Sequence, residues 1–138
     1  MIILDASVAL KWFVPNEPGR VMALHVLDAI AQHPDQFAVP ELFFNEMLSV
    51  LCRTKADKKI IASYMTDLEA LGFSRIGNGH EVLYESIMIA FDFHLSGYDA
   101  IYAACAKLSG GRWLTADEKA CAKLRHTKLG YLLKTWSD

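Results

Sequence analysis

The sequence predicts an α/β protein, a single-domain α/β/α sandwich in which helices cover both faces of a central parallel sheet. Short, continuous apolar runs such as Ile2–Leu4 are typical of strands buried on both faces. These runs alternate with longer segments of helical periodicity, the order expected for a parallel sheet. The 138 residues fit one domain, and neither repeats nor linkers interrupt them. We therefore expect one domain over residues 1–138.

The first half of the chain contains two predicted strands and four predicted helices. Apolar runs predict the strands, and apolar residues recurring every three or four positions predict the helices. Pro15 ends the first helix, Pro40 suits the first turn of the third because it lacks an N–H, and Gly72 ends the fourth. The expected strands are 2–4 and 37–39, and the expected helices are 6–13, 20–32, 40–55 and 57–71.

The second half adds three strands and three helices by the same criteria. Turn residues separate these elements, notably Gly77-Asn78-Gly79 and the pair Gly110-Gly111. The expected strands are 73–76, 113–115 and 131–133, and the expected helices are 80–93, 98–108 and 117–126.

The composition is that of a globular protein, with 53% hydrophobic and 22% charged residues. This apolar share is high for a small domain, so we expect some apolar surface to remain for a partner or a second copy of the chain. The net charge of −2 excludes a strongly basic nucleic-acid binder. Any contact with RNA or DNA must therefore come from a local patch.

Three features bear on where the protein works. Cys52, Cys105 and Cys121 lie in predicted helices without metal-type spacing, so we expect reduced thiols packed as small apolar residues. No apolar run reaches the ~18 residues of a membrane span, and the first residues lack the basic leader of a signal peptide. These features predict a soluble, cytoplasmic protein.

Two carboxylates follow predicted strands. Asp5 comes directly after the first strand, and Asp117 follows the strand ending at Thr115 with only Ala116 between them. Because ligands of open parallel sheets bind beyond the carboxyl ends of the strands, we expect both carboxylates at the same edge. Helix capping is the alternative for each, since a carboxylate at a helix start accepts from free N–H groups.

Glu46 and Asp99 complete the set of candidate acidic residues. Leu42 and Val50 lie four residues before and after Glu46, which places this carboxylate at the edge of an apolar stripe. An unpaired charge buried there costs several kcal/mol, so it needs a cation or strong donors. Asp99 lies three residues after Ser96, a spacing that also fits a simple capping box.

Carboxylates converging on one crevice repel each other unless a cation lies between them. Mg²⁺ and Mn²⁺ prefer oxygen ligands, and such an ion activates water and shields the charge of a phosphodiester. We expect four residues to bind the ion and to act in catalysis: Asp5, Glu46, Asp99 and Asp117. Ser7 and Thr115 are candidates to support them, and ordinary turn and strand hydroxyls are the alternative for these two.

Four segments stand in an order that is similar to a known family. They are LDAS from Leu4, VPELFFNEMLSVL from Val39, LSGYDAIYAACA from Leu95 and LTADEKA from Leu114. Together they resemble the PIN-domain nucleases and, within these, the toxin half of VapBC-type toxin–antitoxin pairs. The resemblance extends from residue 3 to about residue 133, with no departure at the four acidic positions.

The resemblance implies a PIN-like nuclease domain that cleaves RNA with Mg²⁺ or Mn²⁺. It assigns the metal-binding acidic set to Asp5, Glu46, Asp99 and Asp117, with Thr115 as a supporting hydroxyl. It also implies a homodimer and a tight complex with a small antitoxin protein that covers the crevice. The target RNA does not follow, because members of the family differ in their targets.

Two other functions remain open. A non-catalytic module would keep the fold and the crevice but bind RNA or protein without cutting. A receiver-like phosphoacceptor domain would need a second acid beside Asp5 and an Asp after a middle strand, where Ala6 and Gly77 stand. No residue is assigned to RNA, although segment 53–59 is the densest basic run, and Tyr98 and Tyr102 are candidates to line the crevice.

Overall fold

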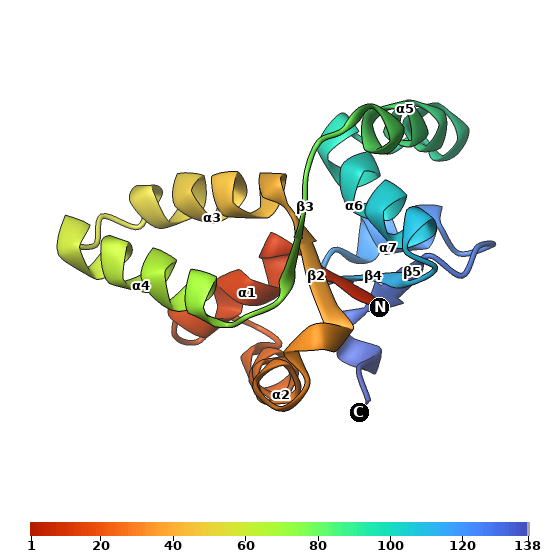
Figure 1. Ribbon diagram of the computed structural model, residues 1–138. Coiled ribbons are helices and arrows are strands. Elements are labelled where there is room, and N and C mark those ends of the chain that lie inside the picture. Colours follow the sequence, from red (N-terminus) through yellow and green to blue (C-terminus); the bar gives the residue numbers. More distant parts are fainter. Residues whose placement is uncertain (138) are drawn as a thin grey trace.

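The computed structural model describes residues 1–137 and confirms a central parallel sheet with helices on both faces (Figure 1). Every neighbouring pair of strands is parallel, and the strand order is β3-β2-β1-β4-β5. The strands are β1 (Ile2–Leu4), β2 (Phe37–Pro40), β3 (Ser74–Ile76), β4 (Arg112–Thr115) and β5 (Gly130–Leu132).

The helices divide between the two faces of the sheet. In Figure 1, α1 to α4 lie on one side and α5 to α7 on the other. The helix after β1 and the helix after β4 therefore cover opposite faces, which makes the gap between these adjacent strands the switch point where such folds bind ligands. The helices are α1 (Ala6–Phe13), α2 (Arg20–Gln32), α3 (Glu41–Arg53), α4 (Lys58–Ala70), α5 (His80–Phe93), α6 (Gly97–Leu108) and α7 (Glu118–Lys123), with short 3₁₀ turns η1 (Pro34–Gln36) and η2 (Leu133–Thr135).

Most predicted bounds are confirmed to within one or two residues, and β1, α1, α2 and α5 have the bounds that the sequence predicted. Pro40 is a correction: its ψ of 157° is extended, so it ends β2 and caps α3 instead of lying in the first helical turn. The second correction is α7, which ends at Lys123 and not near His126. After it, Thr127 N donates to Leu124 O, so the chain continues in tighter turns.

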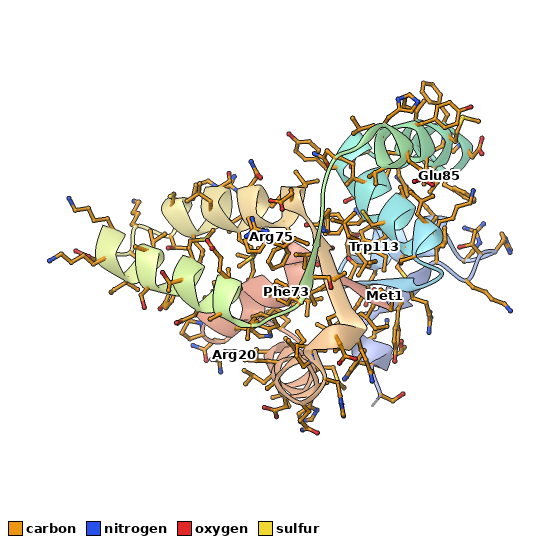
Figure 2. All side chains as sticks on the ribbon, viewed as in Figure 1. Met1, Arg20, Phe73, Arg75, Glu85 and Trp113 are labelled. Carbon is orange, nitrogen blue, oxygen red and sulfur yellow. The ribbon has the colours of Figure 1, made fainter. Side chains whose placement is uncertain are left out.

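Large aromatic residues fill the space between the sheet and the helices. Trp113 of β4 and Tyr102 of α6 are fully buried, and their rings stack with centroids 5.9 Å apart and an interplanar angle of 15°. Figure 2 shows Trp113 between the sheet and α6. On the other face, Phe43 of α3 meets Phe73 edge to face at 5.7 Å. These contacts hold α3 and α6 against the sheet, and both helices carry candidate site residues.

Some apolar surface remains exposed, as the composition predicted. The outer side of α5 presents five large apolar side chains, here called the α5 face: Leu83, Tyr84, Ile87, Met88 and Phe91. Cys105 is buried and Cys121 is half-buried, but Cys52 is exposed on α3, so the expectation of packed thiols is wrong for Cys52. Within residues 1–137, no helix combines the length and apolarity needed to cross a membrane.

Candidate active site

Asp5 lies at the switch point, directly after β1 and beside the end of β4. Its side chain is only 7% exposed, and its backbone N–H donates to Leu114 O at 3.0 Å. Its Oδ2 accepts hydrogen bonds from Ser7 Oγ at 2.8 Å and from Thr115 Oγ1 at 2.5 Å. Within the described chain, the carboxylate makes no capping hydrogen bond to α1. Capping therefore does not explain this aspartate.

The two hydroxyls that hold Asp5 are themselves oriented by the backbone. Ser7 Oγ accepts from Ala116 N, and Thr115 Oγ1 accepts from Asp117 N, each at 3.1 Å. Because an ionised carboxylate only accepts hydrogen bonds, each hydroxyl donates its proton to Asp5 while its oxygen accepts from the backbone. The loop after β1 and the loop after β4 are thereby joined at the point where the two strands end.

Glu46 points from α3 toward the same edge and is half-buried. Its Oε1 accepts a hydrogen bond of 2.7 Å from the hydroxyl of Tyr102, a residue that is 1% exposed. The sequence placed Tyr102 only among residues that line the crevice. Its position three residues after Asp99, on the same side of α6, was the available signal for a closer role.

Asp99 and Asp117 each begin a helix, and capping accounts for part of their geometry. Asp99 N donates to Ser96 Oγ at 3.1 Å, so Ser96 is the cap of α6. Asp117 is exposed, and its Oδ1 accepts from Ala120 N at 3.0 Å as the cap of α7. This cap fixes the direction of the Asp117 carboxylate.

Burial and neighbouring negative charges raise the pKa of three of the carboxylates, Asp5, Glu46 and Asp99. Burial raises the pKa of Asp5 from 3.8 to about 6, the hydrogen bonds from Thr115 and Ser7 oppose this rise, and the charges of Glu46 and Asp99 add to it. Burial and the charge of Asp99 raise the pKa of Glu46. Burial and the charge of Asp117 raise the pKa of Asp99. The fold thus brings the predicted acidic set together as a mutually repelling series, which a cation would stabilise.

The donors in this series are carboxylate oxygens, the ligands that hard divalent cations prefer. Among residues 1–137, no three His, Cys, Asp or Glu side chains lie close enough to hold a metal ion as they stand. The residues that could hold such an ion are the carboxylates of this series, and Mg²⁺ sites in proteins usually combine one or two carboxylates with water.

Lys123 of α7 is a cation near the site that the sequence analysis did not single out. Its Nζ donates to His94 O at 2.8 Å, and its charge opposes the rise in the pKa of Asp99. Lys123 and Asp99 are 24 residues apart, so only the packing of α7 beside the α5–α6 turn brings them together. No local sequence signal indicates this pairing.

The doubly wound sheet and the acidic series at its switch point define an α/β protein with a candidate hydrolytic site. The sequence matches the PIN domain family over residues 2–125, and the chain belongs to that family. PIN domains are generally nucleases. Comparison with curated proteins gives no match.

Solved structures share this fold along nearly the whole chain. A toxin–antitoxin complex from Klebsiella pneumoniae has 22% identity and a TM-score of 0.67, covering 88% of this chain and 91% of that chain. PAE2754 from Pyrobaculum aerophilum has 24% identity and a TM-score of 0.69, covering 97% and 84%. FitAcB from Neisseria gonorrhoeae has 16% identity and a TM-score of 0.75, covering 99% and 100%. At such identities the likeness shows the fold alone.

Proposed function

We propose that this protein is a Mg²⁺- or Mn²⁺-dependent endoribonuclease and the toxin of a type II toxin–antitoxin pair. The observation that carries the proposal is the buried carboxylate of Asp5, held by two hydroxyls and adjoined by the charges of Glu46 and Asp99. A buried charge among like charges costs several kcal/mol unless a cation compensates it. Membership of the PIN domain family supports hydrolysis of phosphodiester bonds.

In this proposal, four carboxylates hold the ion, directly or through water: Asp5, Glu46, Asp99 and Asp117. Ser7 and Thr115 fix the orientation of Asp5, and Tyr102 fixes that of Glu46. When bound, the ion supplies activation of water and shielding of the phosphate charge. The oxygen of water is added to phosphorus as the water gives up one proton to solvent. The bond between phosphorus and the leaving ribose oxygen breaks, and that oxygen takes up a proton from solvent.

The partner in the cell would be a small antitoxin protein that covers the crevice. A toxin–antitoxin complex from Klebsiella pneumoniae is among the structures of the same fold, which supports a partner of this class. A cytoplasmic location fits the three free thiols, because reducing compartments keep cysteines unpaired.

A second copy of the chain is the proposed occupant of the α5 face. Phe91 is 80% exposed, and Tyr84 and Ile87 are each more than half exposed, so the face can form the apolar centre of an interface that buries ~800 Å² on each partner. The stripe contains no charge, so two copies related by a two-fold axis can pack this helix against itself.

The test is cleavage of a mixed RNA pool by purified protein with Mg²⁺, Mn²⁺ or EDTA. Wild type is compared with Asp99→Asn and with Asp28→Asn, a matched change at an exposed residue of α2. We expect metal-dependent cutting by wild type and Asp28→Asn, and a loss of at least about 100-fold in Asp99→Asn, the upper end for residues one layer outside a metal site.

Three results would contradict the proposal. Equal cutting by wild type and Asp99→Asn, or cutting that survives EDTA, would show that the activity belongs to another site or to a contaminant. RNA binding without cutting in either metal would favour the non-catalytic module.

A further inference from the structure

A groove of about 310 Å³ adjoins the candidate active site along α3. Its lining includes Glu46, so the groove contains a carboxylate of the acidic series. Arg53 lies seven residues further along the same helix, which corresponds to about 10 Å. Tyr98 lines the groove from the first turn of α6, one residue before Asp99.

The side chains of Tyr98 and Arg53 are exposed in this groove, where a ligand could contact them. Tyr98 is 62% exposed, and its ring stacks on no other ring within residues 1–137. Arg53 is exposed, and it forms no ion pair with any residue of the described chain. An exposed aromatic face and an unpaired guanidinium therefore lie in one groove, beside polar side chains from Asn45 and Ser49.

We propose that this groove is a nucleotide subsite for single-stranded RNA, in which Tyr98 stacks on a base next to the scissile phosphate and Arg53 binds a phosphate of the same strand. The inference rests on the proposed ribonuclease function. Proteins that bind single strands combine aromatic platforms for the bases with cations along the backbone. A base within a duplex is already stacked and paired, so the subsite requires an unpaired nucleotide.

The charge of the protein supports this assignment. With a net charge of −2, the chain attracts a polyanion only through local cations, and Arg53 is such a cation beside the acidic series. An apolar peptide is the competing occupant of a groove this size. The amide of Asn45 and the hydroxyl of Ser49 favour a polar ligand, and the guanidinium of Arg53 favours a phosphate at the end of the groove away from the Glu46 carboxylate.

The first test is binding of a fluorescently labelled single-stranded RNA, measured by anisotropy in EDTA so that no cleavage occurs. We expect Tyr98→Ala to weaken binding roughly 5- to 100-fold, the usual range for loss of one stacked base. Arg53→Gln should weaken binding and lower its salt dependence, because it removes one phosphate contact. Tyr98→Phe keeps the aromatic face and should bind as wild type does. Arg125→Gln removes an exposed arginine outside the groove and serves as the charge-matched control.

The second test is steady-state cleavage with Mg²⁺, which separates this inference from the proposed function. We expect Tyr98→Ala and Arg53→Gln to raise KM more than they lower kcat, because they contact a part of the RNA that does not react. Metal-dependent cleavage by wild type, with RNA binding and KM unchanged in both variants, would overturn the subsite and leave the ribonuclease in place. Unchanged RNA binding with weakened binding of the antitoxin would assign the groove to a protein segment and also overturn it.

Discussion

The charged form of the Asp5 carboxylate is disfavoured by burial but required for metal binding. Its carboxylate lies where desolvation disfavours the charged form, yet a metal ligand must be charged. The hydroxyls of Ser7 and Thr115 favour the charged form, while Glu46 and Asp99 disfavour it. A carboxylate in this position destabilises the metal-free protein at neutral pH, and a bound cation would reverse the effect.

The pH dependence of stability follows from the raised pKa of Asp5. Between 3.8 and about 6 the folded protein keeps a proton that the unfolded chain has lost, so the free energy of unfolding falls as the pH rises through this range. In EDTA at neutral pH, Asp5→Asn should therefore be more stable than wild type by up to about 3 kcal/mol. Urea unfolding at several pH values measures this difference, with Asp28→Asn as the control.

The same urea unfolding measurements could also contradict the role of burial at Asp5. The advantage of Asp5→Asn should shrink as the pH falls from about 6 and disappear below 3.8, where the wild-type carboxyl is protonated in both the folded and the unfolded state. A variant that is less stable than wild type at neutral pH, or a difference that does not change with pH, would show that burial does not control this carboxylate.

Tyr102 allows a second prediction at the scale of one atom. Tyr102→Phe removes only the hydroxyl that donates to Glu46 and retains the ring that stacks on Trp113. We expect the free energy of unfolding to fall by about 1 kcal/mol and the affinity for Mn²⁺ to fall roughly 10- to 100-fold. Chemical denaturation and calorimetric titration measure the two effects, with Tyr131→Phe as the control. Unchanged Mn²⁺ affinity would refute a positioning role.

The sequence predicted which acidic residues form the candidate site, but it did not predict the side chains that contact them. Asp5 and Asp117 could be placed at one edge because each follows a strand, and Glu46 stood out because it interrupts an apolar stripe. The hydrogen bond from Tyr102 to Glu46 links α6 to α3, and the contact of Lys123 with His94 O links α7 to the end of α5. Such contacts depend on how helices pack, which local periodicity does not specify.

At the scale of elements, α5 is apolar on two opposite sides. Val82 and Ile89 are buried against the protein, while Ile87 and Phe91 are exposed. A helix that is apolar all round is usually buried on all sides. Its exposed stripe therefore indicates an interface.

Phe91→Glu tests that interface. A charge at the most exposed position of the α5 face should convert a dimer to a monomer, because burying an unpaired carboxylate costs several kcal/mol. Size-exclusion chromatography with light scattering at high micromolar concentration measures the mass. Val21→Glu, at a 70% exposed position on α2, should leave the dimer intact. A monomeric wild type, or a dimer unaffected by Phe91→Glu, would contradict the assignment.

The bounds of helices and strands could be predicted where proline or glycine-rich turns flank them. Pro15 and the Gly77-Asn78-Gly79 turn delimit α1 and α5, and both helices have the predicted ends. The end of α7 could not be predicted in this way. Residues 124–127 continue in turns with hydrogen bonds three residues apart, and periodicity does not separate such turns from an α-helix.

At the scale of the molecule, the sheet order decides which residues meet. The alternation of strands and helices predicted a parallel sheet, but it did not specify that β1 and β4 are neighbours. That pairing brings Thr115 to Asp5 across 110 positions of the sequence, at the edge where the charges of Glu46 and Asp99 also act on Asp5. The candidate site therefore depends on the strand order of the sheet, which brings together carboxylates that are far apart in the sequence.

The central claim is that this acidic series binds a divalent cation, and calorimetric titration of the metal-free protein with Mn²⁺ at neutral pH tests it most directly. We predict saturable binding to wild type and binding weaker by at least about 100-fold in Asp5→Asn. Equal binding by the two proteins, or no binding by wild type, would contradict the account.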